Sequence, residues 1–300
     1  MQVVTMSETG GPEVLQILDA PRPEPADGQV LVRVRAVAVN PIDWKYRRGL
    51  IPKDLPAVLG SDISGVVEQS RAAGFAPGDE VFGFAASGAY AEFALSPAAL
   101  LARKPAGISH EQAAALPVAA LTAWQALFDV AGLTAGQTAL IAGAAGGVGH
   151  LAVQFARVAG IHAIGTASER NREFVLGLGA ERFVDYNSEE PASVAHDVDM
   201  AFDTVGGATT ASALDCVRSG GVLVTIAAAP PEQAAARGVR AEMLIMSPSS
   251  EQLARVADLV AAGEVKVEIA ATMALAQVRE AHALSESGHT RGKIILTLDG

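Results

Sequence analysis

Residues 138–149 read TALIAGAAGGVG, an apolar run that ends in a turn rich in glycine. The run TALIA has the length and composition of a buried strand, and residues 147–160, GVGHLAVQFARVAG, have the pattern of an amphipathic helix. A glycine-rich turn between a strand and a helix is where unpaired N–H groups at the helix N-terminus bind a pyrophosphate. The stretch therefore predicts a dinucleotide-binding turn.

The glycines of this turn depart from the usual spacing G-x-G-x-x-G, because Ala144 stands where the first of those glycines is expected. The spacing that fits is G-x-x-G-x-x-G, and we expect the small Ala144 side chain to be accommodated. Gly146 and Gly147 would let a phosphate approach the backbone, and Gly149 would let the helix pack close to the strand. The alternative is a plain strand-to-helix turn whose glycines only make it tight.

Strands and helices alternate from this turn to about residue 227, which predicts a doubly wound parallel sheet. The first hundred residues are rich in short strands, and 29–39 is the clearest, with apolar residues alternating at period two. Three hundred residues exceed what one core usually holds, so we expect two domains. The last fifty residues have no glycine-rich turn, and we expect them to rejoin the first domain.

Composition excludes several classes of function. A net charge of −11 argues against binding nucleic acid or an anionic membrane surface. The single cysteine, Cys216, rules out an internal disulfide and a cysteine-rich metal lobe. The first residues, MQVVTMSETG, lack the features of a signal peptide, so we expect a cytoplasmic protein.

The end of the second strand of the alternating region indicates which dinucleotide binds. NAD-binding proteins place an acidic residue there to bond the ribose 2′-hydroxyl, whereas Ser168 stands at this position and Arg170 and Arg172 follow. Hydroxyl and guanidinium groups suit a 2′-phosphate, so we expect NADPH. Glu169 would repel a phosphate if it pointed inward, and all these charged residues are alternatively a solvated first turn.

Six stretches in order make the chain resemble the medium-chain dehydrogenase/reductase superfamily, in its zinc-independent quinone-oxidoreductase-like (zeta-crystallin-like) branch. They are NPIDWKYRRG at 40–49, LPAVLGSDISGVV at 55–67, GDEVFG at 78–83, AGAAGGVG at 142–149, LGAERFVDY at 178–186 and FDTVGG at 202–207. The resemblance implies a GroES-like β-rich catalytic domain over 1–115 and 249–300 and a Rossmann NADP-binding domain over 116–248. It also implies NADPH in the cleft and a homodimer.

The same resemblance implies residue roles around the cofactor. Ser168, Arg170, Asn171 and Arg172 would surround the 2′-phosphate, and Gly146, Gly147 and Val148 would cradle the pyrophosphate. The remaining cofactor contacts would be Lys45 and Thr122 near the nicotinamide, Tyr186 near the adenosine, Val205 and Gly206 near the nicotinamide ribose, and Gly292 and Lys293 from the returning C-terminal segment.

The zinc ligands of related dehydrogenases have no counterpart here. The position of a ligand cysteine corresponds to Asn40, and the segment that would carry Gly-His-Glu reads Gly60-Ser61-Asp62. The six histidines show no ligand-like pair. We therefore expect no metal. Hydride transfer without a Lewis acid suits an acceptor that needs little polarisation, such as a quinone or a conjugated enone.

Asn40, Lys45 and Tyr46 are the catalytic candidates. The Asn40 amide can donate to a substrate carbonyl, but Asn-Pro also simply turns a chain out of a strand. Lys45 would contact substrate and nicotinamide ribose, or is a solvated helix residue. Tyr46 would donate to the substrate or stack on a flat quinone, or packs with Trp44. We expect Asp43 to be a helix N-cap and Arg47 a structural ion-pair partner, and no side chain stands out as a proton donor.

These observations predict an NADPH-dependent reductase of quinones or α,β-unsaturated carbonyls with a small-molecule substrate. Two alternatives stay open. An enoyl reductase for carrier-bound acyl chains would need a basic docking face, which the overall acidity disfavours. A non-catalytic NADPH-binding sensor or structural protein is the other, because a fold alone does not prove chemistry.

Overall fold

The computed structural model describes residues 1–298 and divides the chain into two compact units. The catalytic unit comprises Met1–Val118, Pro248–Gly263 and Val267–Gly300, and the Rossmann unit comprises Ala119–Ser247 and Glu264–Lys266. The chain first passes between the units at 118/119, close to the predicted boundary at 115/116. Within residues 1–298, no helix combines the length and the apolar character needed to cross a bilayer.

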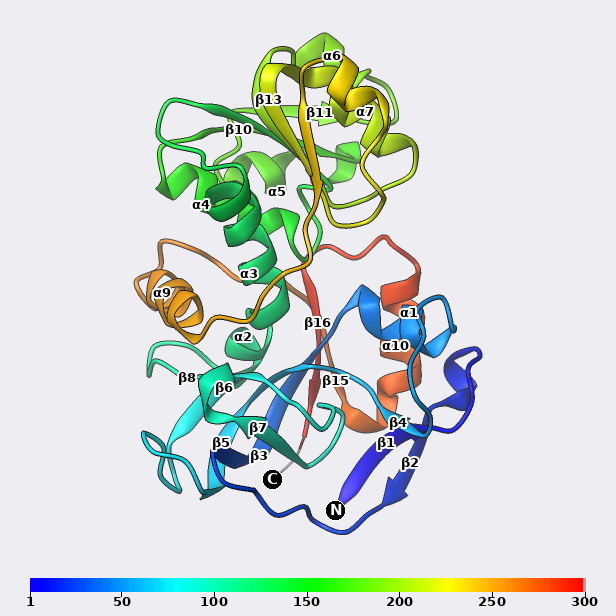
Figure 1. Cartoon of the computed structure of the whole chain (residues 1–300), viewed down its shortest axis with the longest axis vertical. Coiled ribbons are helices and arrows are strands. Elements are labelled where there is room, and N and C mark those ends of the chain that lie inside the picture. Colours follow the sequence, from blue (N-terminus) through cyan, green and yellow to red (C-terminus); the bar gives the residue numbers. More distant parts are fainter. Residues whose placement is uncertain (299–300) are drawn as a thin grey trace. The chain divides into compact units, whose positions relative to one another are not determined.

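The Rossmann unit is built on one six-stranded parallel sheet in the order β11-β10-β9-β12-β13-β14 (Figure 1). Numbered along the chain this is 3-2-1-4-5-6, the order of dinucleotide-binding folds. The predicted alternation of strands and helices is confirmed. The strands are β9 (Thr138–Ala142), β10 (His162–Ala167), β11 (Arg182–Asp185), β12 (Val198–Asp203), β13 (Val217–Thr225) and β14 (Arg240–Met243).

Helices connect these strands, as right-handed parallel crossovers require. They are α4 (Gly149–Val158), α5 (Arg172–Gly177), α6 (Pro191–Val194), α7 (Ala208–Cys216) and α8 (Gln233–Ala236), with a short 3₁₀ turn, η4 (Glu169–Asn171), before α5. Ahead of β9, α3 (Pro117–Trp124) continues into a π-helical turn, η3 (Gln125–Val130). Pro117 is the first residue of α3.

The catalytic unit holds two sheets. Three strands form the order β2-β1-β4, and a larger sheet runs β15-β16-β3-β5-β6-β8 with β7 paired to β3. The strands are β1 (Gln2–Met6), β2 (Gln16–Asp19), β3 (Gln29–Val39), β4 (Ala57–Val58), β5 (Asp62–Ser70), β6 (Glu80–Phe84), β7 (Phe93–Pro97), β8 (Leu101–Arg103), β15 (Ile269–Ala274) and β16 (Lys293–Thr297). Because β16 pairs with β3, the last part of the chain completes the sheet that the first part begins.

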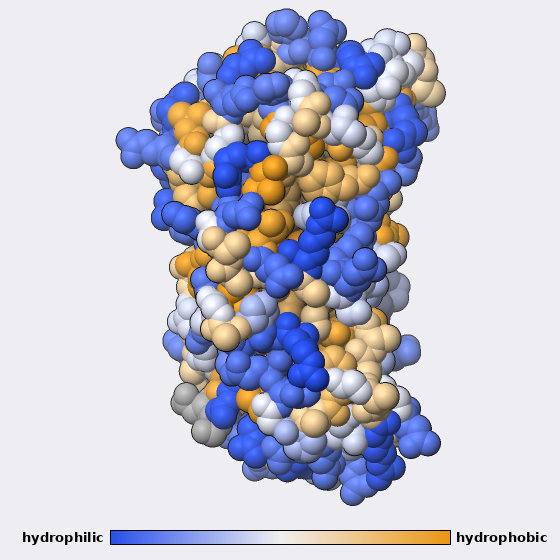
Figure 2. All heavy atoms as spheres, turned by 90° about the vertical axis from the view of Figure 1, so that its left-hand side faces the viewer, coloured by the Kyte–Doolittle hydropathy of each residue, from blue (hydrophilic) through white to orange (hydrophobic). Residues whose placement is uncertain are grey.

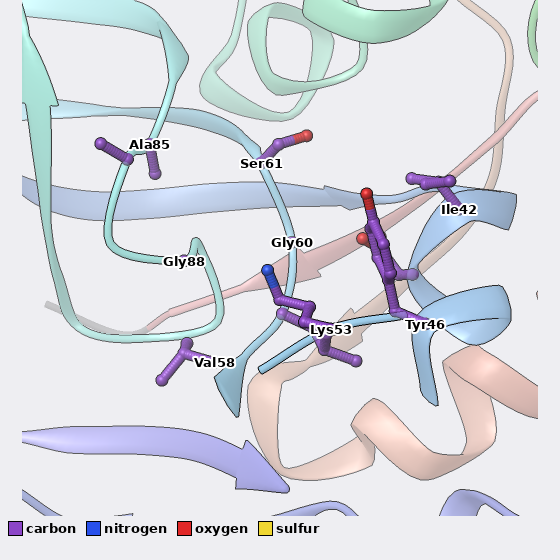
Figure 3. A pocket seen from close by; sticks show the side chains of 11 residues that line it. Ile42, Tyr46, Lys53, Val58, Gly60, Ser61, Ala85 and Gly88 are labelled. Atoms are coloured by element: carbon purple, nitrogen blue, oxygen red, sulfur yellow. The ribbon is translucent and has the colours of Figure 1, made fainter. Parts of the chain in front are cut away.

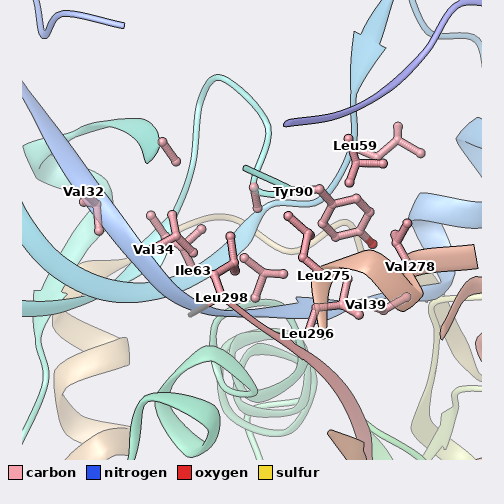
Figure 4. Packing of buried hydrophobic residues seen from close by; sticks show 14 of the residues in the cluster. Val32, Val34, Val39, Leu59, Ile63, Tyr90, Leu275, Val278, Leu296 and Leu298 are labelled. Atoms are coloured by element: carbon pink, nitrogen blue, oxygen red, sulfur yellow. The ribbon is translucent and has the colours of Figure 1, made fainter. Parts of the chain in front are cut away.

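Helices and short turns complete this unit. They are α1 (Pro41–Arg47), α2 (His110–Ala114), α9 (Ser250–Ala261) and α10 (Val278–Glu286), with 3₁₀ turns η1 (Pro12–Val14), η2 (Ala98–Leu100) and η5 (Leu275–Gln277). The core gathers apolar side chains of β3, β5, β16 and α10 around the buried ring of Tyr90 (Figure 4). Figure 4 shows Leu59 and Val278 on either side of that ring.

Two predicted strands were wrong in part. The run VKVEIA at 265–270 predicts a strand, but the strand begins only at Ile269, because the N–H and C=O of Lys266 bond the Gln154 side chain at 2.7 and 2.8 Å and cannot join a ladder. The run AYAEFAL at 89–95 also predicts a strand, but that strand begins only at Phe93, because the N–H groups of residues 89 and 90 donate to the Leu59 carbonyl.

The glycine turn holds α4 close to β9. A Cβ placed on Gly149 would lie 2.1 Å from the Gly143 carbonyl oxygen, which no side chain tolerates. Gly143 has a φ of +74°, a conformation that favours glycine. Ala144 is fully buried in the turn, and a Cβ on Gly165 of β10 would lie 2.9 Å from the Ala144 Cβ. The missing glycine is therefore accommodated because the neighbouring strand has a glycine opposite it.

We expect Gly149→Ala to lower the free energy of unfolding by about 1–3 kcal/mol, because overpacking would push α4 off β9. The matched control is Gly177→Ala at the end of α5, where a Cβ would meet nothing within 4 Å. That variant should be unchanged or slightly more stable. Urea unfolding followed by circular dichroism measures both, and equal midpoints would refute this account of the turn.

Candidate functional site

Backbone N–H groups are left without partners where α4 begins. Among residues 1–298, Gly147 and Val148 donate their N–H groups to no acceptor, and both are partly exposed. The positive end of a ten-residue helix adds to their attraction for an anion. A phosphate group of a dinucleotide would satisfy these donors, so the turn fits the predicted pyrophosphate site.

The turn lies beside the loop after β12, at the point where the strand order reverses. A Cβ on Gly143 would lie 2.4 Å from Thr204 Oγ1 and 3.0 Å from Val205 Cγ2. Asp203, which is fully buried, holds this loop by accepting from the N–H groups of Val205 and Gly206, both at 2.9 Å. Ligands of open parallel sheets bind at such reversal points, outside the carboxyl ends of the strands.

The end of β10 carries polar side chains and no inward acid. Asn171 Nδ2 donates to Ser168 Oγ at 3.2 Å, so two of the predicted phosphate contacts lie together. Glu169 accepts from Arg172 Nε at 2.7 Å, and this bond holds the pKa of the Glu169 carboxyl below its usual value. Arg172 also lies over the Phe183 ring, 4.5 Å from its centre. The Arg172 guanidinium group thus pairs with the Glu169 carboxylate.

The other cofactor candidates of this unit differ in exposure. Tyr186 and Val205 are both 55% exposed, and Thr122 is buried on α3. Figure 2 shows a face of the surface where hydrophilic side chains predominate and apolar ones gather in patches between them. Exposed apolar side chains at strand ends, such as Val205 beside the glycine turn, are surface that a bound ligand would cover.

A pocket of about 260 Å³ opens in the catalytic unit. It is lined by Ile42, Asp43, Tyr46, Lys53, Val58, Leu59, Gly60, Ser61, Ala85, Ala86 and Gly88. Figure 3 shows the Lys53 ammonium group pointing toward Gly60 and the Tyr46 hydroxyl pointing to the space between Ser61 and Ile42. Lys53 Nζ lies 5.1 Å from the centre of the Tyr46 ring, a distance at which a cation is attracted to the ring face.

Asn40 is a buried residue that directly follows β3. Its Nδ2 donates to Asp62 Oδ2 at 3.0 Å, and its Oδ1 accepts from the ammonium group of Lys293. Burial raises the pKa of the Asp62 carboxyl and lowers the pKa of the Lys293 ammonium group, while the attraction between the two opposes both shifts. The ammonium group of Lys293 therefore lies beside Asn40 and Asp62.

A second buried chain of polar groups runs from Asp43 to α10. Asp43 Oδ2 accepts from the Asn40 N–H at 2.8 Å and from the Tyr90 hydroxyl at 2.9 Å. His282 Nε2 lies 3.1 Å from the same hydroxyl. Burial raises the pKa of Asp43 to about 6 and lowers the pKa of His282 to about 3, so His282 is neutral at physiological pH.

These contacts correct one prediction and confirm another. Asp43 was expected to be the N-cap of α1, but Asn40 precedes the helix and Asp43 lies in its first turn, where it bonds the Asn40 N–H. Arg47 was expected to be a structural ion-pair partner. It is fully buried, and its Nη2 lies 2.5 Å from Glu286 Oε2 on α10.

The three catalytic candidates have different surroundings in the catalytic unit. Tyr46 lines the pocket, Asn40 lies buried behind it, and Lys45 places its Nζ 5.9 Å from the centre of the Trp44 ring and outside the pocket lining. Gly292 has a φ of +81° and directs the chain into β16, where Lys293 is buried. Sequence reasoning missed Lys53 and the polar chain of Tyr90 and His282, because their partners are distant in sequence.

Metal binding finds no support in the donor set. Within the described part of the chain, no three His, Cys, Asp or Glu side chains gather where they could hold a metal ion. Cys216 is buried on α7 in the Rossmann unit, and burial raises the pKa of its thiol to about 11. The side chains of Asn40 and Asp62 bond each other, and Asn40 also accepts from Lys293.

Comparison with known proteins identifies the family. Residues 26–106 match the model of the alcohol dehydrogenase GroES-like domain, and residues 178–296 match the model described as zinc-binding dehydrogenase. The chain is 33% identical to the chloroplast envelope quinone oxidoreductase homolog of Arabidopsis thaliana, over 96% of this chain and 95% of that protein. The chain belongs to the medium-chain dehydrogenase/reductase superfamily, and it is an oxidoreductase related to the quinone oxidoreductases.

Solved structures agree with this assignment. The quinone oxidoreductase of Coxiella burnetii has a TM-score of 0.93 at 34% identity, covering 100% of this chain and 99% of that one. The Escherichia coli quinone oxidoreductase, solved in complex with NADPH, also has a TM-score of 0.93, at 28% identity, covering 99% of this chain and 100% of that one. The predicted fold class, a Rossmann sheet with a GroES-like β-rich domain, is confirmed.

We expect Tyr90→Phe to lower the free energy of unfolding by about 1–3 kcal/mol, because it leaves His282 Nε2 unpaired and takes one donor from Asp43. Tyr186→Phe is the matched control, since its ring is 55% exposed and it makes no hydrogen bond to residues 1–298. Denaturant titration at pH 7 measures both. A loss that is equal in the two variants would contradict the buried role of the Tyr90 hydroxyl.

Proposed function

We propose that this protein transfers a hydride from NADPH to a quinone or an α,β-unsaturated carbonyl compound, without a metal. The observation that carries the proposal is the unpaired N–H pair at the start of α4, together with the acid-free end of β10. A related structure supports it, since the E. coli quinone oxidoreductase was solved with NADPH. NADPH supplies the hydride; the protein binds, orients and stabilises charge.

The proposed cofactor contacts are those expected from the sequence. Gly146, Gly147 and Val148 would hold the pyrophosphate, and Ser168, Arg170, Asn171 and Arg172 would surround the 2′-phosphate, with Arg172 also bonding Glu169. The remaining proposed contacts are Lys45, Thr122, Tyr186, Val205, Gly206, Gly292 and Lys293.

The pocket of the catalytic unit suits a flat acceptor with a carbonyl oxygen. Ile42, Val58, Leu59 and Ala85 give it apolar walls, and the Tyr46 hydroxyl and Lys53 ammonium are its hydrogen-bond donors. Donors fixed where negative charge develops on oxygen stabilise the transition state more than the ground state. We assign this role to Tyr46 first and to Lys53 with it, and keep Asn40 and Lys45 as further candidates.

Metal-free chemistry is supported by what surrounds Asn40. The Lys293 ammonium group bonds Asn40 and faces Asp62, so a positive charge already accompanies the residues that correspond to metal ligands in relatives. A metal ion there would face that charge at short range. The predicted homodimer and the cytoplasmic location remain part of this proposal; one relative is a chloroplast envelope protein by name.

The first experiment follows NADPH oxidation with 1,4-benzoquinone and with a simple enone, using protein whose zinc content has been measured. We expect turnover with at least one acceptor, substoichiometric zinc, and the same rate after treatment with EDTA. Lack of turnover with every electrophilic acceptor, despite tight NADPH binding, would favour a sensor or structural protein. Turnover only with carrier-bound acyl chains would favour the enoyl reductase.

The second experiment tests the 2′-phosphate site with the double variant Ser168→Ala/Arg170→Ala. Removing a hydroxyl and a guanidinium group from the phosphate should raise KM for NADPH at least tenfold, which corresponds to about 1.4 kcal/mol, and leave KM for NADH nearly unchanged. Arg237→Ala is the control, because Arg237 pairs with Asp215 on the surface of the same unit. Equal changes for both cofactors would refute the assignment.

A further inference from the structure

The two oxygens of the Asp43 carboxyl group have different surroundings. Oδ2 accepts hydrogen bonds from the Asn40 N–H and the Tyr90 hydroxyl. Among residues 1–298, Oδ1 accepts none, although Asp43 is only 3% exposed. Asp43 lines the pocket, and Oδ1 is the carboxyl oxygen that the surrounding protein leaves unbonded.

The neighbours of Tyr90 determine which oxygen carries a proton. A tyrosine hydroxyl has one hydrogen, and here it can be directed to Asp43 Oδ2 or to His282 Nε2. A carboxyl oxygen cannot serve as donor when it accepts the Asn40 N–H and the Tyr90 hydroxyl together. With Tyr90 donating to Asp43, His282 donates from Nε2, and a protonated Asp43 carries its hydrogen on Oδ1.

We propose that Asp43 is the proton donor of the reduction, delivering its Oδ1 hydrogen to the substrate anion formed by hydride transfer. This inference rests on the proposed function. The Oδ1–H bond breaks, its electron pair stays on the Asp43 carboxylate, and the proton forms an O–H bond with the hydroquinone anion or enolate. No further oxidant or reductant is needed, and water entering the pocket returns the proton to Asp43.

The charged groups around Asp43 favour both the release of its proton to the substrate and the return of a proton from water. Burial and the Asp62 carboxylate on β5 raise the pKa of Asp43, whereas the bonds from Asn40 and Tyr90 and the Lys293 ammonium on β16 lower it, with a result of about 6. A group with a pKa near the working pH both gives up and regains a proton readily. The Tyr90 hydroxyl is already placed to stabilise the carboxylate that remains after transfer.

The test measures kcat for benzoquinone reduction at saturating NADPH from pH 5 to 9. Wild-type kcat should fall as pH rises through about 6, because the acid form is the donor. Asp43→Asn keeps an oxygen that accepts from Asn40 and Tyr90 but has no acidic proton. We expect its kcat at pH 6 to be lower by about 10²–10⁴-fold, a typical contribution of general acid catalysis, and to be independent of pH.

Two further measurements separate a chemical role from a structural one. The Kd for NADPH, followed by cofactor fluorescence, should be unchanged in Asp43→Asn. Tyr90→Phe removes a bond that lowers the pKa of Asp43, so the pH midpoint of kcat should move upward while the enzyme stays active. This second variant decides the matter if Asp43→Asn does not fold.

Two results would overturn the assignment of Asp43: a wild-type rate and pH profile in Asp43→Asn, or an unmoved midpoint in Tyr90→Phe. Wild-type protein that binds NADPH but reduces no acceptor would instead overturn the proposed function, and the proton-donor role with it. The wild-type assay thus distinguishes the two failures before any variant is made.

Discussion

Lys293 and Asn40 are separated by 253 positions in the sequence, and the hydrogen bond between them joins the two ends of the catalytic unit. The bond exists because β16 pairs antiparallel with β3, with Ile294 opposite Val39, so that the first residue of β16 meets the residue after β3. Asp62, at the start of β5, completes the group. Burying an ammonium group is costly unless it is paired, so this contact constrains all three strands.

The rest of the polar interior follows from that arrangement. Asn40 precedes α1, and its N–H donates to Asp43. Asp43 also accepts from the Tyr90 hydroxyl, which lies 3.1 Å from His282 Nε2 on α10. Arg47 extends the same chain of contacts to Glu286. The pocket lies along this helix, with Asp43 and Tyr46 in its wall. A buried acid, a hydroxyl and a lysine thereby line one pocket together with apolar side chains, a setting in which proton transfer and charge stabilisation are effective.

In the Rossmann unit, small residues allow α4, β9 and β10 to pack closely at the glycine turn. Gly149 allows α4 to approach β9, and Gly165 leaves room for the Ala144 that replaces a glycine in the turn. The departure from the usual motif is thus compensated on the adjacent strand, and the unpaired N–H groups of the turn are retained. Glu169, which looked unfavourable for a phosphate, is held by Arg172.

The sequence by itself determined the features that depend on neighbouring residues. The alternation of strands and helices, the glycine turn, the acid-free end of β10 and the strand at 29–39 were all predicted from local spacing. Two strands were misplaced, at 89–95 and 265–270, because hydrogen bonds from Leu59 and Gln154, distant in sequence, override the local pattern.

Only the tertiary structure decided which polar side chains meet. Asp43 looked like a helix cap, Asp62 like part of a turn and Lys293 like a cofactor contact, and nothing in the sequence linked Tyr90 or His282 to any of them. Their roles depend on pairings over 22 to 253 positions, which the sheet register creates. Burial of these groups, which sets the pKa of Asp43, likewise exists only once the strands and α10 have closed around them.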